Sequence, residues 1–313
     1  MVIDTHVHLI IPGFVKSKFI IGNARMASHI FNRVNSANLT PSQYIDLLKE
    51  RVDPDGTKLI ETMDKAGIDK SVIFGVDWAY AVTGEPRVSN REQNRIHADL
   101  ANRWDGRLIA LAALDPRRPD ILEQATEAIE EWGMRGFKLH PSAGFYPNDP
   151  VCFPLYEKCA DWGVPIVFHS GGLEFHWEFG QPMYIASAAE RYPEVEMVMA
   201  HAGTESWQQA LLAAAALPNV YLDISLRQWD YRVNSEKFYE WLRNLIDWAG
   251  PWKVLFASDY PLPSFWVPQH EWVNAIKKPD TRIPFTPEEL EIIMGKAAQA
   301  VFSAAIHDRS TDG

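Results

Sequence analysis

The sequence predicts an α/β protein whose fold is a distorted (β/α)8 barrel, and two patterns along its 313 residues support this prediction. Eight short runs rich in Val, Ile, Leu and Phe recur, and each is nearly continuous in apolar residues. Such runs are typical of parallel strands covered on both faces of a sheet. Amphipathic helical segments separate the runs. Repeated strand–helix units form either a closed barrel or a doubly wound open sheet, and the number of strands favours the barrel.

The boundaries of the elements follow from apolar runs and glycines. The expected strands cover residues 2–8, 71–76, 108–114, 136–140, 164–169, 195–201, 219–224 and 253–259. Glycine closes helices because it readily adopts the left-handed conformation. The expected helices that end just before a glycine are 55–66, 119–132 and 155–162. A last helix is expected from about Pro287.

Two stretches exceed a minimal barrel unit, approximately residues 10–54 and 262–286. In the first, Thr40, Pro41 and Gln43 form a capping box that opens a short helix. The second is dense in Pro and Trp. Both leave from the C-terminal ends of strands, so we expect them to overhang the face where barrel active sites lie. No linker divides the chain, and we expect residues 1–313 to form a single domain.

Composition restricts the classes of partner. The formal charge is −11, from 41 acidic and 30 basic residues, and no basic cluster could gather phosphates, so we expect no nucleic-acid partner. No signal peptide or apolar run long enough for a bilayer occurs, so we expect a cytoplasmic protein without membrane contact. Cys152 and Cys159 are expected to be buried thiols. The expected partners are a small-molecule substrate and a second copy of the chain, in a homo-oligomer, most simply a dimer.

Ionisable side chains gather at the C-terminal ends of the expected strands. They are His6 and His8 on the first strand, Lys138 and His140 on the fourth, His169 on the fifth, His201 on the sixth and Asp259 on the eighth. Residues two apart on a strand point to one face, so His6 and His8 both face the barrel axis. Each residue alone could be an ordinary polar strand end. Together they predict a divalent metal, because burying so many ionisable groups without a cation is unfavourable.

Five motifs occur in the order DTHVH, GFKLHP, FHSGG, AHAG and FASDYP. This order resembles the amidohydrolase superfamily, and most closely the amidohydrolase-related branch that includes metal-dependent hydrolases and the aminocarboxymuconate semialdehyde and resorcylate type decarboxylases. The resemblance covers residues 2–261. It implies a metal, commonly zinc, held by His6, His8, His169 and Asp259, with His201 beside it.

Lys138 leaves the number of metal ions open. In binuclear members of the superfamily a carboxylated lysine on the fourth strand bridges two metals, and His169 and His201 would then bind the second ion. The alternative is a lysine that binds substrate as a cation. The FKLHP context favours one ion, which we expect to be Zn²⁺ or another divalent transition metal such as Mn²⁺. Because the decarboxylases of the branch usually lack this lysine, its presence favours hydrolysis.

The sequence therefore predicts a metal-dependent hydrolase that uses a metal-activated water on a small, cyclic or aromatic carboxylate, ester or amide. Asp259 is the expected proton carrier, and His201 or Lys138 would stabilise the oxyanion. The alternative is a metal-dependent, non-oxidative decarboxylase of an aromatic or enoic acid. A second alternative is a non-catalytic barrel stabilised by its metal. A serine hydrolase is not expected, because no GxSxG motif accompanies Ser170.

Residues that bind the substrate are harder to predict. We expect His140, Arg227, Trp78 and Trp177 to contribute, since each follows an expected strand at the mouth of the barrel. Arg227 could pair with a substrate carboxylate or with a surface acid. Glu174 and His176 are further candidate polar groups after the fifth strand.

Overall fold

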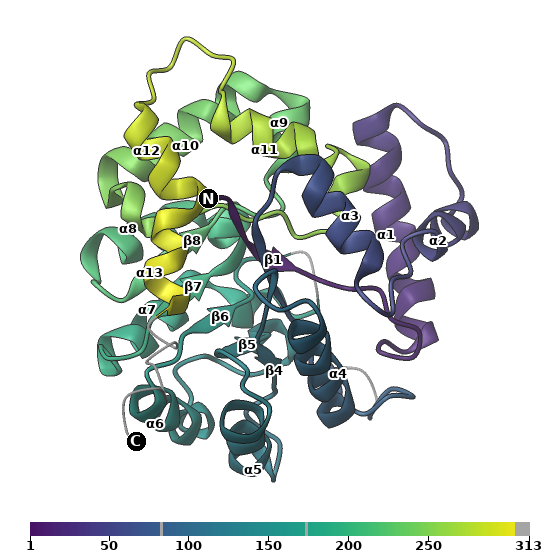
Figure 1. The fold of residues 1–313 in the computed structure, drawn as a ribbon, viewed down its shortest axis with the longest axis vertical. Coiled ribbons are helices and arrows are strands. Elements are labelled where there is room, and N and C mark those ends of the chain that lie inside the picture. The colour runs from purple at the N-terminus through teal and green to yellow at the C-terminus, as the bar shows by residue number, and fades with distance from the viewer. Residues whose placement is uncertain (82–83, 173–174, 304–313) are drawn as a thin grey trace.

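The computed structural model describes residues 1–81, 84–172 and 175–303, and its strands stand at the centre with helices around them (Figure 1). All pairs of neighbouring strands are parallel, in the order β1-β2-β3 and β4-β5-β6-β7-β8-β9. The strands are β1 (Ile3–Val7), β2 (Lys70–Ile73), β3 (Leu108–Ala110), β4 (Ala112–Ala113), β5 (Phe137–Leu139), β6 (Ile166–Phe168), β7 (Met197–Met199), β8 (Val220–Asp223) and β9 (Val254–Leu255).

Each expected strand is present, and the third is interrupted at Leu111 into β3 and β4. The interruption is local, because the Leu111 N–H still donates to the Ile73 carbonyl at 3.0 Å and the Ala112 N–H donates to Gly136 at 2.9 Å. Backbone bonds also connect the segment at β9 with β1: the Thr5 N–H donates to the Phe256 carbonyl at 3.0 Å. These bonds join the two ends of the strand series, as a barrel requires.

The helices lie outside the strands and in the two long insertions (Figure 1). They are α1 (Ser17–Asn35), α2 (Pro41–Lys49), α3 (Thr57–Ala66), α4 (Asn90–Arg103), α5 (Ile121–Thr126), α6 (Phe153–Trp162), α7 (Pro182–Arg191), α8 (Trp207–Ala216), α9 (Gln228–Val233), α10 (Ser235–Ala249), α11 (Gln269–Lys277), α12 (Pro287–Glu291) and α13 (Ala297–Ser303). No helix in the described part of the chain is long and apolar enough to span a bilayer.

The predicted helix ends are largely confirmed. The capping box of α2 is present, with the Thr40 hydroxyl accepting from the Gln43 N–H, and α3 and α6 end at the left-handed glycines Gly67 and Gly163. The expected helix 119–132 is shorter and continues from α5 as a π-helical turn, Glu127–Glu131. Cys152 and Cys159 are buried free thiols, as predicted.

Alternation along the strands divides the core into two parts. Val167, Val198 and Leu255 point inward and form a cluster with residues of the last helical segment, whereas Phe168 and Met199 point outward into the larger cluster beneath the surrounding helices. The last helical segment, α12 to α13, lies beside β1 and the N-terminus (Figure 1). Inward positions near the C-terminal strand ends are therefore left for polar side chains.

The two insertions meet each other. Phe265, from the insertion after β9, packs against Phe31 of α1 and Tyr44 of α2, with ring centroids 6.3 Å and 6.2 Å apart. Phe19, near the start of α1, packs on Trp78 after β2 at 4.4 Å. The first insertion thus reaches the C-terminal ends of the strands, as predicted.

Candidate functional site

The inward register continues from apolar to polar residues toward the C-terminal strand ends. Just after β6, His169 follows Val167 by two positions, and on β8, Asp223 follows Tyr221 by two. The same register after β9 leads from Leu255 to the position of Asp259. The barrel thereby brings together side chains that are distant in sequence.

His6, His8 and Asp259 form a triangle of potential ligand atoms. His6 Nε2 lies 3.2 Å from His8 Nε2, and Asp259 Oδ1 lies 3.6 Å and 3.5 Å from these two nitrogens. Tetrahedral ligands at bonds of about 2.0–2.2 Å stand roughly 3.4 Å apart. The three atoms therefore have spacings that suit one shared cation.

The second nitrogen of each imidazole fixes the direction of the first. His6 Nδ1 lies 2.8 Å from Asp223 Oδ2, and His8 Nδ1 lies 3.0 Å from the Phe74 carbonyl oxygen. Both partners are acceptors, so both Nδ1 atoms carry the proton and both Nε2 atoms present a lone pair. Two lone pairs and a carboxylate oxygen within 3.6 Å repel one another. A divalent cation between them removes this repulsion, and the hydrogen-bonded second nitrogen is typical of metal-binding histidine.

His201 is oriented by the same network. Its Nδ1 lies 2.8 Å from Ser225 Oγ, and because the Ser225 hydroxyl donates to Asp223, Oγ accepts the His201 proton. His201 Nε2 then faces His169 Nδ1 at 3.3 Å. His6, His201 and Asp223 form a second group whose ligand atoms could hold a metal. We call His6, His8, His169 and His201 the histidine cluster.

Burial and neighbouring charges keep His6, His8 and His201 neutral. Burial, and then the charges of Lys138 and His8, hold the pKa of His6 well below its usual range. Burial and Lys138 lower the pKa of His8 to about 3, and burial with the charge of His6 holds that of His201 well below its usual range. Neutral imidazoles are the form that binds metal ions.

Strained backbone places two of these residues. His201 has φ 59° and Asp259 has φ 58°, in the left-handed region that side chains larger than glycine rarely adopt. At His201 the N–H donates to Asp223 Oδ1 at 2.9 Å, and at Asp259 the N–H donates to the His6 carbonyl at 2.8 Å. These bonds hold both side chains against neighbouring strands.

Lys138 and His140 lie next to the histidine cluster. Lys138 is 2% exposed, and its Nζ stands 4.9 Å from the centroid of the Phe74 ring. The same ring lies 4.8 Å and 5.0 Å from those of His6 and His8. His140 stacks on His169 with centroids 4.2 Å apart. Lys138, His6 and His8 all lie within about 5 Å of the same Phe74 ring, so the charge of the buried lysine is close to the two histidines.

The predicted substrate-binding residues do not all converge. Trp78 lies 5.4 Å from His140 by ring centroids, beside the candidate site. Trp177 is 52% exposed. Arg227 is paired with Asp230 at 2.7 Å and stacks over Trp241 at 4.3 Å. The structure gives Arg227 intramolecular partners, and its predicted role toward a substrate carboxylate stays a prediction.

His176 and Glu174 are the two remaining candidate polar groups. His176 is exposed, with its Nδ1 4.0 Å from Glu178 Oε1. Glu174 lies outside the described residues.

Sequence reasoning missed two buried acidic residues that organise the site, Asp223 and Asp4. Asp223, the last residue of β8, joins β1 to the segments after β7 and β8 through bonds to His6, His201 and Ser225. Within β1, the buried Asp4 accepts hydrogen bonds from the Ser258 N–H and hydroxyl at 2.9 Å and 2.6 Å. Burial raises the pKa of Asp4 to about 7. The available signal for Asp223 was its place at the end of a strand run, two residues before Ser225.

Comparison with known sequences decides the family of this site. The model of the family described as amidohydrolase matches residues 3–303. The chain belongs to the amidohydrolase family. The resemblance based on the five motifs is confirmed by this match. A search of curated proteins gives no match.

Several solved structures share the fold of this amidohydrolase. An uncharacterised TIM-barrel protein from Bordetella bronchiseptica is 20% identical, with a TM-score of 0.73 over 98% of this chain and 99% of that one. A 5-carboxyvanillate decarboxylase from Sphingomonas paucimobilis is 16% identical, with a TM-score of 0.66 over 96% and 98%. A dihydroxybenzoic acid decarboxylase from Polaromonas sp. JS666, with bound manganese and the inhibitor 2-nitroresorcinol, is 15% identical, with a TM-score of 0.66 over 96% of each chain. These likenesses confirm the predicted barrel.

Proposed function

We propose that this amidohydrolase is a metal-dependent, non-oxidative decarboxylase of an aromatic acid. The observation that carries the proposal is the triangle of His6 Nε2, His8 Nε2 and Asp259 Oδ1, whose inward lone pairs suit a divalent cation. The decarboxylases of aromatic acids that share the fold support the class of substrate. This is the alternative that the sequence suggested, and it now takes precedence over hydrolysis.

His6, His8 and Asp259 would hold the metal, with His169 or His201 as a further ligand. The cation supplies a Lewis acid that binds substrate oxygen atoms and stabilises negative charge. Manganese in a structure of the same fold supports Mn²⁺ beside Zn²⁺ as the candidate ion. Asp223 keeps the His6 ring in the tautomer that leaves Nε2 free for a cation.

The chain's own residues supply the proton and the cationic environment. In decarboxylation the bond between the ring and the carboxyl carbon breaks, CO₂ leaves, and the ring carbon takes up one proton. We assign the proton transfer to Asp259, whose carboxyl group is 16% exposed and lies beside both β1 histidines. Lys138, buried beside Phe74, would stabilise negative charge that develops on the substrate.

The test uses carboxyl-¹³C-labelled hydroxybenzoates and methoxylated hydroxybenzoates, with Mn²⁺ or Zn²⁺ added. We expect labelled CO₂ and bicarbonate, and in D₂O one deuteron at the ring position that carried the carboxyl group. The doubly substituted His6→Ala, His8→Ala protein should lose both metal and CO₂ release. If no aromatic acid loses its label while esters, lactones or amides are cleaved, the enzyme is a hydrolase.

The buried Lys138 keeps hydrolysis as the second candidate, because a carboxylated lysine would suit a binuclear hydrolase. Lys138→Met distinguishes these roles. If the lysine stabilises substrate charge, the variant keeps its metal content and loses kcat or gains KM. If the variant instead loses metal, the lysine is a ligand and the binuclear hydrolase takes precedence. Elemental analysis of each variant measures the difference.

A further inference from the structure

Three aromatic rings meet beside the candidate site, and each comes from a different segment of the chain. Phe19 lies near the start of α1, Trp78 follows β2, and Phe175 follows β6. The ring centroids of Phe19 and Trp78 are 4.4 Å apart, and the Phe175 centroid is 5.2 Å from each of them. At these distances aromatic rings pack against one another. We call these three residues the aromatic wall.

The aromatic wall adjoins the histidine cluster through His140. The ring centroids of Trp78 and Phe175 lie 5.4 Å and 6.3 Å from that of His140. His140 in turn stacks on His169 of the histidine cluster, with centroids 4.2 Å apart. Phe19 joins this row of rings through Trp78 and Phe175. The aromatic wall therefore begins one ring away from the histidine cluster and ends at α1.

Each ring of the aromatic wall keeps part of its surface exposed. Phe19, Trp78 and Phe175 are half-buried, whereas core rings such as Phe137 and Phe168 are fully buried. Exposed apolar surface shared by several neighbouring side chains is typical of ligand-binding sites. The flat faces of such rings suit a ligand that itself carries an aromatic ring.

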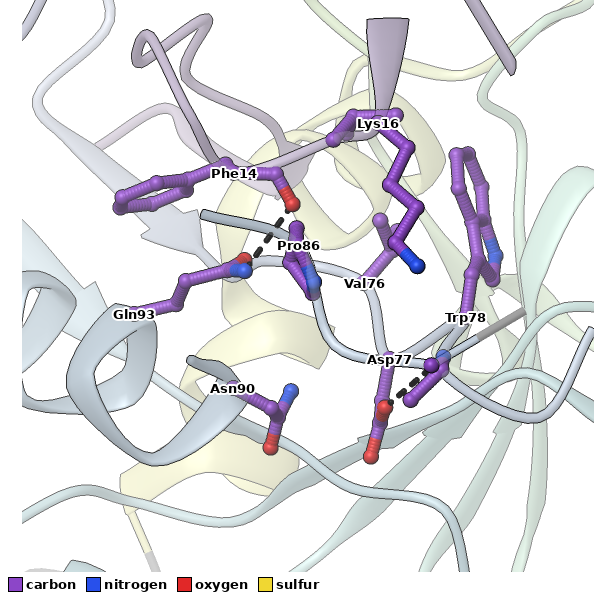
Figure 2. Close-up of a pocket in the computed structure, with 11 residues that line it drawn as sticks. Phe14, Lys16, Val76, Asp77, Trp78, Pro86, Asn90 and Gln93 are labelled. Carbon is purple, nitrogen blue, oxygen red and sulfur yellow. Dashed lines mark hydrogen bonds between the residues drawn. The ribbon is translucent and has the colours of Figure 1, made fainter. Parts of the chain in front are cut away.

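Hydrogen bonds fix the start of α1 and thereby the place of Phe19. Gln93 Nε2, in α4, donates to the Phe14 carbonyl oxygen at 2.9 Å (Figure 2). The Val88 N–H donates to the Gly13 carbonyl oxygen at 3.0 Å. These two bonds tie the segment before α1 to the segment that begins α4. The position of Phe19 is therefore set by the body of the barrel.

The backbone of Phe175 also indicates a fixed position. Its φ is 47°, in the left-handed region that aromatic residues rarely adopt. The N–H of the next residue, His176, donates to the Ser142 carbonyl oxygen at 3.2 Å, which ties this segment to the turn after β5. Strained backbone of this kind clusters at ligand sites, where the surrounding structure holds it in place.

We propose that the aromatic wall forms the end of the substrate site that lies away from the metal ligands, and that Phe19 limits the size of the substituent there. The inference rests on the proposed function, because an aromatic acid supplies the ring that the wall would contact. A benzoate whose carboxylate is held at His6, His8 and Asp259 directs its para position away from them. A small para substituent would pack on the aromatic wall, and a large one would collide with the Phe19 ring.

Binding of simple benzoates tests the size limit without requiring turnover. The ligands are benzoate, 4-methylbenzoate, 4-tert-butylbenzoate and biphenyl-4-carboxylate, titrated calorimetrically into the full-length protein loaded with Mn²⁺. In the wild type, biphenyl-4-carboxylate should bind at least about tenfold more weakly than 4-methylbenzoate. Phe19→Ala should bind biphenyl-4-carboxylate about tenfold more tightly than the wild type does, and benzoate no more tightly. A partly unfolded variant would not bind any ligand more tightly.

Phe31→Ala is the matched control. Phe31 lies on the same helix as Phe19, but its ring packs against Tyr44 and Phe265. The control should therefore loosen α1 without opening the aromatic wall, and the ratios of the four affinities should stay within about twofold of the wild-type ratios. Phe19→Trp changes the wall in the opposite direction and should weaken the binding of 4-tert-butylbenzoate further.

Unchanged affinity ratios in Phe19→Ala overturn the proposal. An equal gain for biphenyl-4-carboxylate in Phe31→Ala also overturns it, because the gain then comes from a loosened α1. Equal affinity of the wild type for all four ligands does the same. These results leave the release of CO₂ untouched, so the proposed function is tested separately by the labelled hydroxybenzoates. A size limit that moves in Phe19→Ala, without CO₂ release from any aromatic acid, rejects the decarboxylase and keeps the aromatic wall.

Discussion

Two clusters of buried polar side chains lie near the C-terminal ends of the strands, and they differ in how their charges are compensated. After β2 and β4, Asp77 and Asp115 meet Arg118, which contacts Asp77 Oδ1 at 2.8 Å. We call these three residues the ion-pair cluster. Burial raises the pKa of Asp77, and the Arg118 guanidinium opposes this shift. The histidine cluster instead gathers imidazoles with lowered pKa around the Asp259 carboxylate.

The two clusters differ in what the lone pairs of their oxygen and nitrogen atoms face. In the ion-pair cluster both oxygens of Asp77 are occupied by donors of the chain itself. In the histidine cluster the protons of His6 and His8 point outward to Asp223 and Phe74, and the lone pairs point toward each other. The first arrangement is complete as a structural element. The second is complete only with a cation, which is why we assign the chemistry to it.

Replacing Arg118, the positively charged member of the ion-pair cluster, should give the largest effect, a loss of free energy of unfolding. Arg118→Met leaves Asp77 buried without its partner, and loss of one member of a buried pair lowers the free energy of unfolding by about 3–5 kcal/mol. Chemical denaturation measures this. Arg91→Met, which removes pairs to the more exposed Glu123 and Glu127, is the control and should lower the free energy of unfolding much less. Equal effects of both substitutions would erase the distinction between buried and exposed pairs.

The corresponding change in the histidine cluster should affect turnover more than stability. Asp259→Asn keeps an oxygen ligand but cannot carry the proton, so kcat should fall by about 10²-fold or more while metal remains bound. Steady-state kinetics and elemental analysis measure the two quantities. A variant that retains wild-type kcat would remove Asp259 from the proton transfer and weaken the contrast between the clusters.

Asp223, which hydrogen-bonds to His6 and His201, should have an intermediate effect when replaced, and the quantity that changes is metal affinity. Asp223→Asn removes the carboxylate that orients His6 and accepts from His201, and such changes typically weaken metal affinity about 10–100-fold. Competition with a metal-binding dye gives the affinity. The same substitution tested by denaturation in chelator separates loss of metal from loss of fold. Unchanged metal affinity would mean that packing alone fixes the imidazoles.

The smallest expected effect is on the pH dependence of the free energy of unfolding. It concerns His97, a buried imidazole outside both clusters. Burial lowers its pKa from 6.5 to about 4. Its contribution to stability is therefore present above pH 6.5 and is lost as the pH falls toward 4, because the unfolded chain binds the proton first. One proton corresponds to a slope of about 1.4 kcal/mol per pH unit. Unfolding measured from pH 6.5 to 4 should show a slope smaller by this amount in His97→Gln than in the wild type.

Much of the fold was predictable because its signals are local. The apolar runs marked the strands, and Gly67, Gly163 and the Thr40 capping box marked helix ends that the structure confirms. The break at Leu111 was not predictable, since it arises where β3 pairs with β2 while β4 pairs with β5. The π-helical turn after α5 likewise has no signal that we recognised.

The candidate site was predictable in its ligands and not in their supports. His6, His8 and Asp259 carry a recognisable motif and meet as expected. Asp223 and the residues of the ion-pair cluster are all polar side chains near strand ends. The sequence alone does not say which partner each of them will contact. Arg227 illustrates the reverse: its place after a strand suggested a substrate contact, whereas the structure pairs it with Asp230.

By itself the sequence determined the succession of strands and helices, the face on which each strand residue lies, and the residues capable of binding a metal. These properties depend on spacing within a few residues and on side-chain chemistry. Tertiary structure alone decided the tautomers of His6, His8 and His201 and the compensation of Asp77 by Arg118. Each depends on atoms brought together from separate strands, and a hydrogen-bonding group is defined by the partner it meets.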